Sequence, residues 1–171
     1  MTYKTHILGG VLGGLLAAQT TNSSEVAVIV GVSTVFSLAP DIDIPNSKAG
    51  NKFGIVSKGI NKAFGHRGLF HSPILYLVIA YFLRNILPFP ILLGGLVGVG
   101  SHLFLDMFNS TGIPVLYPLS RSKISFAKIK TRSAGETFFA LLLIIAIIIV
   151  VYTMITNKTY SELIVMVKNI I

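Results

Sequence analysis

The segment from residue 134 to residue 156 constrains the fold of this chain more than any other part of it. The segment is almost entirely apolar, and its centre at 141–151 contains only aliphatic residues. About 20 consecutive apolar residues suffice to cross the hydrocarbon core of a bilayer as a helix. Across the whole chain, 53% of the residues are hydrophobic and the mean hydropathy is +0.78. We therefore expect an integral membrane protein.

Four shorter apolar segments precede this one, at 6–20, 25–39, 72–88 and 91–109. Several of their glycines recur four residues apart, as in Gly10/Gly14 and Gly94/Gly98. This spacing lets helix backbones approach closely within lipid. The predicted fold is all-α, a polytopic helical membrane protein with about five transmembrane helices that form a single domain over 1–171. We also expect 1–18, which resembles a signal peptide, to be retained in the mature protein.

The basic residues predict the orientation of these spans. Eleven of the 14 Lys and Arg lie before the first span or in the second and fourth connections. Because basic residues concentrate on the cytoplasmic side, the N-terminus is expected in the cytoplasm. In the second connection, Phe53, Val56, Ile60 and Phe64 recur at helical spacing, with lysines around the other side. This pattern predicts an amphipathic helix lying on the membrane surface.

The composition also excludes several kinds of site. The chain has no cysteine, so it has neither disulfides nor thiolate metal ligands, and any metal site must use His, carboxylate, carbonyl or water. Its net charge is +8, but it has neither a basic helix nor a run of stacking aromatics. We attribute the charge to membrane topology and anionic lipid headgroups, and expect no nucleic-acid partner.

The scarce ionisable residues fall into short motifs. There are four histidines and six acids in all, and ionisable groups near a bilayer usually have a function because they are costly there. His102 and Asp106 are four residues apart and therefore share one helix face. The predicted orientation places all the motifs at cytoplasmic helix ends. The predicted metal ligands are His6, Asp41, Asp43, His66, His71, His102 and Asp106.

This set exceeds the three protein ligands of a mononuclear catalytic zinc site, so two divalent ions are expected, with Zn favoured and Mn or Mg as alternatives. Two metals can stabilise the attacking and leaving oxygens of phosphoester hydrolysis. Asp43 or Glu136 is predicted to act as base, and Arg67 to bind phosphate through its planar guanidinium. Other interpretations stay open for single residues: His6 as a packed histidine, Asp41 as a turn cap, Glu136 as an acid favoured by the helix dipole.

In these motifs the chain resembles the YdjM-type inner-membrane proteins, a group described as membrane-bound metal-dependent hydrolases. The matching elements are Thr5-His6, 38–43 (LAPDID), 66–72 (HRGLFHS), 102–106 (HLFLD), Gly112 and Tyr117-Pro118. The resemblance implies a metal-dependent hydrolase in a bacterial or archaeal cell membrane, distantly similar to zinc-dependent phospholipase C. The family often has a histidine shortly after the second aspartate. Here Asn46 or Ser47 would replace it.

The leading hypothesis is hydrolysis of a phosphoester or ester bond in a membrane lipid, anionic or phosphate-bearing. The alternatives are a transporter and a metal-binding membrane protein without catalysis. A transporter should place polar residues near the middle of the bilayer and often has two related halves. Here the polar residues are predicted at one face and no repeat is evident, which argues against a transporter and leaves the metal-binding membrane protein without catalysis open.

Overall fold

The computed structural model describes residues 1–21, 23–64 and 67–156, and in this part of the chain it is helical with no strand. Six α-helices and three short 3₁₀ segments follow in order: α1 Tyr3–Ala18, η1 Ser23–Glu25, α2 Val26–Phe36, η2 Pro40–Asp43, α3 Lys48–Phe64, η3 Leu69–His71, α4 Pro73–Leu83, α5 Phe89–Met107 and α6 Ala134–Thr156. The segment between α5 and α6 is irregular apart from two isolated β-bridges. The predicted all-α class is confirmed.

Three segments are long and apolar enough to cross a membrane: Val26–Asp43, Phe89–Met107 and Ala134–Thr156. The chain is therefore a membrane protein with three candidate spans in its described residues. At 16 and 11 residues, α1 and α4 are shorter than the roughly 20 residues that a perpendicular crossing needs. The expected count of five transmembrane helices thus stays a prediction for these two segments.

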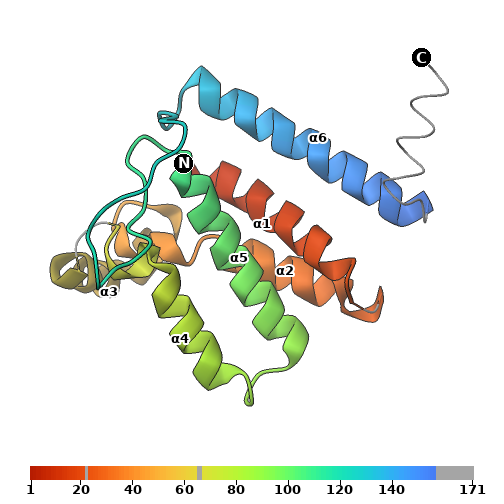
Figure 1. The fold of residues 1–171 in the computed structure, drawn as a ribbon, viewed down its shortest axis with the longest axis horizontal. Coiled ribbons are helices and arrows are strands. Elements are labelled where there is room, and N and C mark those ends of the chain that lie inside the picture. Colours follow the sequence, from red (N-terminus) through yellow and green to blue (C-terminus); the bar gives the residue numbers. More distant parts are fainter. Residues whose placement is uncertain (22, 65–66, 157–171) are drawn as a thin grey trace.

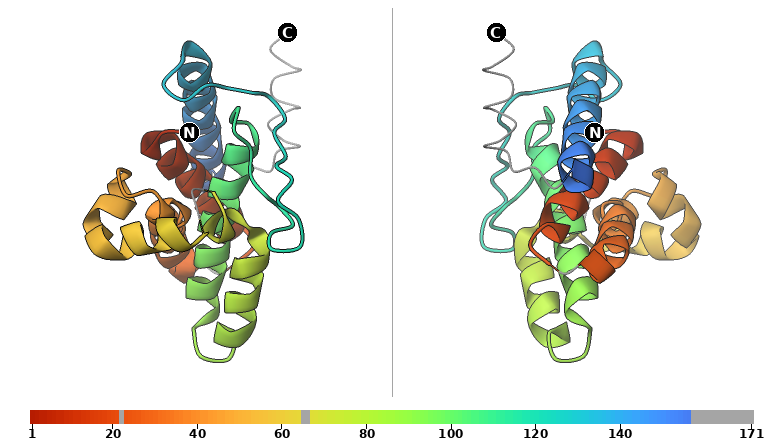
Figure 2. Two further views of the ribbon diagram at one scale, coloured as in Figure 1. Left: turned by 90° about the vertical axis from the view of Figure 1, so that its left-hand side faces the viewer. Right: turned by 90° about the vertical axis from the view of Figure 1, so that its right-hand side faces the viewer.

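The centre of the molecule is a bundle of α1, α2 and α5, with α4 folded back along α5 and α6 lying along α1 (Figure 1). The chain start, the end of α5, the start of α4 and the start of α6 lie at one end of the bundle, where α3 projects to the side (Figures 1 and 2). The α1–α2 and α4–α5 connections lie at the other end. With the end of α2, which leads into η2, this arrangement brings the ends of five helices to one side, as the sequence predicts.

Glycines explain how the three central helices approach so closely. A Cβ added at Gly98 on α5 would lie 2.3 Å from the carbonyl oxygen of Ser33 on α2. A Cβ at Gly14 on α1 would lie 2.8 Å from the Cα of Val30. Only a residue without a side chain permits helices to approach this closely. The glycines thus have the role in close helix packing that their spacing predicts.

We expect Gly98→Ala to lower the thermal midpoint of the purified protein, because the methyl group would separate α2 from α5. Overpacking of this kind costs about 1–3 kcal/mol. Gly100→Ala is the matched control on the same helix, since a Cβ there meets nothing within 4 Å. It should leave the midpoint unchanged or raise it, because alanine favours helix by up to about 1 kcal/mol. Equal midpoints for both variants would contradict the packing argument.

The second connection contains the helix predicted there, although α3 is not continuous. Gly54 has a φ of +46°, which bends the helix near its middle. Such a backbone conformation favours glycine. Phe53 and Val56 are exposed, together with Lys52 and Lys58. These exposed apolar and basic side chains fit an interfacial helix, and its position on the membrane surface stays a prediction.

Candidate metal centre

Six of the seven predicted metal ligands lie together at the end of the bundle where the helix ends meet. They come from four elements: His6 from α1, Asp41 and Asp43 from η2, His71 from η3, and His102 and Asp106 from α5. Asp41 is 8% exposed and the other five are fully buried. The seventh, His66, lies outside the described residues. We call the six the His/Asp cluster.

The centre of this cluster alternates carboxylate oxygens with imidazole nitrogens. Asp41 Oδ1 lies 3.7 Å from His102 Nε2 and 3.8 Å from His71 Nε2. Asp106 Oδ2 lies 3.8 Å from His102 Nε2 and 3.7 Å from His71 Nε2. In a tetrahedral site with bonds of about 2.1 Å, ligand atoms are roughly 3.4 Å apart. Each of these four oxygen–nitrogen distances is thus close to the ligand spacing of a tetrahedral metal site, and His71, His102 and Asp106 form a group whose ligand atoms all lie within 4.8 Å of one another.

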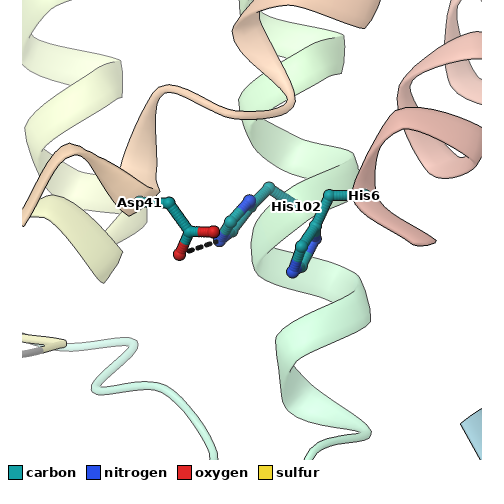
Figure 3. A group of neighbouring side chains, drawn as sticks. All are labelled: His6, Asp41 and His102. Atoms are coloured by element: carbon teal, nitrogen blue, oxygen red, sulfur yellow. Dashed lines mark ion pairs between the residues drawn. The ribbon is translucent and has the colours of Figure 1, made fainter. Parts of the chain in front are cut away.

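His6 provides a third imidazole beside this centre. Its ring stacks on that of His102 with the centroids 3.7 Å apart, and Figure 3 shows the His102 ring between Asp41 and the His6 ring. Its Nε2 lies 3.5 Å from Asp106 Oδ1. Neither ring nitrogen of His6 has a hydrogen-bond partner among the described residues. A buried polar atom without a partner is costly, so this imidazole is suited to a ligand.

Hydrogen bonds at Nδ1 fix the orientation of two histidine rings, His102 and His71. His102 Nδ1 lies 2.7 Å from the carbonyl oxygen of Ser37. Because a carbonyl only accepts, Nδ1 carries the proton and Nε2 presents its lone pair to the cluster. Asp43 Oδ2 lies 3.1 Å from His71 Nδ1 and fixes that ring in the same way. Partners of this kind are usual for histidines that bind metals.

Asp43 therefore contacts His71 at Nδ1, the ring nitrogen that points away from the centre of the cluster, and not at Nε2. The same oxygen, Oδ2, accepts a hydrogen bond of 3.0 Å from the backbone N–H of Arg67. Asp43 is absent from both groups of side chains whose ligand atoms lie within 4.8 Å of one another, His6/Asp41/His102 and His71/His102/Asp106. The contacts with His71 Nδ1 and the Arg67 N–H are those of a residue that orients its neighbours, and the predicted roles of Asp43 as ligand and base stay predictions.

The backbone of Arg67 contacts Asp43, and its side chain contacts Asp106. Its Nη2 lies 2.7 Å from Asp106 Oδ2, and its Nη1 donates to the Gly112 carbonyl at 3.0 Å and to the Thr111 hydroxyl. The Met1 amino group lies 2.7 Å from Asp106 Oδ1. Three buried carboxylates thus face two buried cationic groups. The excess negative charge is a physical reason for a bound cation, because unpaired buried charge is costly.

Glu136, predicted as a possible base, lies outside the cluster. Its Oε1 accepts hydrogen bonds from the Thr5 hydroxyl at 2.8 Å and from the Thr2 backbone, and its Oε2 accepts one of 2.6 Å from the Arg132 backbone. Its own N–H donates to Ser133 Oγ at 3.3 Å. This arrangement resembles a capping box at the start of α6. Glu136 therefore holds the start of α1, which carries His6, against α6.

We expect Glu136→Ala to destabilise the protein by about 1–3 kcal/mol, because it removes the acceptor of buried hydrogen bonds. Metal affinity should fall as a secondary effect, through the displacement of His6. Thermal unfolding and metal titration of the same preparation measure both. Glu136→Gln keeps an oxygen acceptor at one position and should retain most of the stability. A variant that unfolds normally but loses all turnover would instead support the predicted catalytic role.

A cavity of about 1000 Å³, which we call the basic cavity, opens beside the cluster. Asp41 and Arg67 line it, and they connect it to the buried ligands. Asn46 and Ser47 line it as well. Ser47 Oγ donates to the Asp41 carbonyl and accepts from the Gly50 N–H, so Ser47 orders the start of α3. The cationic side chains of this basic cavity are Lys4, Lys48, Lys52, Arg67 and Arg132.

Sequence reasoning missed the residues that position the ligands. The Ser37 carbonyl carries no motif, since any residue supplies a carbonyl, and Thr5 was noted only as part of the Thr5-His6 element of the resemblance. Gly112 gave a signal, because it belongs to the matching elements of the resemblance. It has a φ of +60°, and its carbonyl accepts from Arg67.

Comparison with known proteins identifies related membrane proteins. The family described as YdjM inner membrane protein matches residues 1–167. The uncharacterized protein YvsG of Bacillus subtilis is 37% identical over 119 residues, which cover 69% of this chain and 74% of that protein. The inner membrane protein YdjM of Escherichia coli is 32% identical over 129 residues, 69% of this chain and 66% of that protein. No solved structure matches.

Proposed function

Since the chain belongs to the YdjM inner membrane protein family, we propose that it is a membrane-embedded metal-dependent hydrolase that cleaves a phosphoester or ester bond of a membrane lipid. The observation that carries this proposal is the alternation of two aspartate oxygens with two histidine nitrogens at 3.7–3.8 Å, beside a cavity lined by cations. Neither structural packing nor helix capping requires that arrangement of buried acids and imidazoles.

The residues proposed to hold a divalent ion are Asp41, His71, His102 and Asp106, with His6 next to them. Both groups of possible ligands include His102, whose single Nε2 lone pair binds one ion. We therefore propose one ion for the described cluster, where the sequence suggested two. Its nitrogen and oxygen donors suit Zn²⁺, with Mn²⁺ as an alternative. Such an ion acts as a Lewis acid that activates water and polarises the scissile group.

The protein's own groups are proposed to bind the substrate and accept a proton. Asp41 is the cluster carboxylate that lines the basic cavity. We therefore propose that Asp41 accepts a proton from the attacking water. Asp43 and Glu136 do not line this cavity. Lys4, Arg132 and the α3 lysines would attract a phosphate or carboxylate group to it. Burial of the cluster excludes bulk water, which strengthens these electrostatic interactions.

The test is turnover by the purified, reconstituted protein. A panel of phospholipids and polyprenyl phosphates would be incubated with the protein, with the protein plus chelator, and with chelated protein resupplied with Zn²⁺ or Mn²⁺. We expect hydrolysis of at least one lipid, its loss on chelation and its recovery with metal. Metal-free protein with full activity would refute the proposal.

A further inference from the structure

A second, apolar cavity of about 570 Å³ lies between α1, α2 and α3. Ile7, Phe36, Ile42, Ala49 and Phe53 are among its lining residues. We call it the apolar groove. It lies at the end of the bundle where α2 continues into η2, so it is on the same side as the His/Asp cluster. Its volume and lining suit a hydrocarbon chain better than a polar molecule.

The apolar groove and the basic cavity meet. Tyr3, Lys48 and Lys52 line both of them. Lys48 Nζ lies 5.3 Å from the centroid of the Tyr3 ring, a cation–π distance. This contact joins the start of α1 to the start of α3 at the boundary between the two spaces. A molecule in both spaces would therefore have its apolar part on one side of Tyr3 and its charged part on the other.

The charges at this boundary favour an anion. The basic cavity has five cationic side chains, and Asp41 is its one lining carboxylate. Lys48 and Lys52 are exposed, so they can turn toward a bound group. Lysine binds phosphate as a point charge and arginine binds it through a planar pair of donors. Phosphate is thus the group that this cavity fits best.

We propose that one phosphate-bearing lipid occupies both spaces, with its phosphate in the basic cavity beside Asp41 and a hydrocarbon chain in the apolar groove beneath α3. This inference rests on the proposed function for the choice of bond, but lipid binding itself requires no reaction. In this pose a phosphoester lies at the His/Asp cluster and the chain esters lie further away. In hydrolysis, water oxygen bonds to phosphorus, the bond from phosphorus to the lipid oxygen breaks, and that oxygen takes a proton.

Binding of phosphatidic acid with a fluorescent chain to the full-length protein in phosphatidylcholine nanodiscs tests the proposal. Lys52→Gln should weaken binding about tenfold, the effect of one charge-assisted hydrogen bond. Its control, Lys58→Gln, changes an exposed lysine of α3 that lines neither cavity and should bind like wild type. Ala49→Trp should fill the groove and weaken binding about tenfold. Its control, Ala63→Trp on the same helix, should leave binding unchanged.

The two parts of the lipid are separated by competition. Unlabelled phosphatidic acid should displace the probe at much lower concentration than glycerol 3-phosphate or inorganic phosphate, because those lack the chain. Equal competition by inorganic phosphate, with Ala49→Trp like wild type, would show a free-phosphate site and overturn the proposal. Equal binding of fluorescent phosphatidylcholine, unchanged by Lys52→Gln, would show that ordinary bilayer lipid covers the groove and would also overturn it.

The failure of this proposal is distinguishable from failure of the proposed function, because binding is measured on chelated protein. Selective binding without turnover of any lipid would refute the hydrolase function and support the lipid site. If Ala49→Trp and Lys52→Gln leave turnover unchanged, the hydrolase function would stand and the lipid site would be refuted. Circular dichroism of each variant establishes that it is folded before binding is compared.

Discussion

His102→Ala is expected to reduce the metal content of the purified protein from about one ion per chain to near zero. His102 belongs to both groups of possible ligands, and its Nε2 lies between two aspartate oxygens. Loss of a central ligand leaves too few donors for a four-coordinate site. Inductively coupled plasma mass spectrometry after extensive dialysis measures the content, and turnover should fall with it.

The variant needs a control for folding, because His102 is fully buried and its Nδ1 bonds to the Ser37 carbonyl. His102→Gln retains hydrogen-bonding capacity and should fold with little change in unfolding temperature while it still loses the ion. Ser101→Ala is the neighbouring control on α5, since Ser101 bonds only to its own helix at the Gly98 carbonyl. Full metal content in His102→Gln would remove His102 from the site.

Asp43→Asn should lower metal affinity by about 10–100-fold, although Asp43 lies behind His71 instead of beside its Nε2. The carboxylate holds His71 through Nδ1 and also binds the Arg67 backbone, so both would lose their anionic partner. Titration with a chromophoric metal competitor measures the affinity. If Asp43 were itself a ligand or the base, as the sequence predicted, other results would follow. If Asp43 were a ligand, Asp43→Asn would bind almost no metal. If Asp43 were the base, Asp43→Asn would bind metal with normal affinity but show no turnover.

The grouping of the His/Asp cluster could be predicted because its residues are scarce and chemically specific. Four histidines in an apolar chain leave few alternatives, and the distribution of basic residues placed His6, His71 and His102 at the same end of the bundle. The helices were predictable for a similar reason, since α5 and α6 consist of long apolar segments. Glycine spacing likewise predicted close helix packing at Gly98, although it did not identify α2 as the partner.

The division of roles among the carboxylates could not be predicted from spacing. Asp41 and Asp43 are two residues apart, yet one lines the cavity and the other lies behind His71, because η2 is a short 3₁₀ turn. Glu136 lies at the same end of the bundle, but its carboxylate accepts hydrogen bonds from the Thr5 hydroxyl and from the backbone of Thr2 and Arg132. The bend at Gly54 was also missed, because a glycine in a helical pattern does not specify its own φ.

The most direct test of the central claim is an anomalous diffraction measurement at the zinc or manganese edge on crystals of the metal-loaded protein. We expect one anomalous peak within about 2.0–2.2 Å of Asp41 Oδ1, His71 Nε2, His102 Nε2 and Asp106 Oδ2. A peak elsewhere, or no peak at these atoms in protein shown to contain the metal, would contradict the claim.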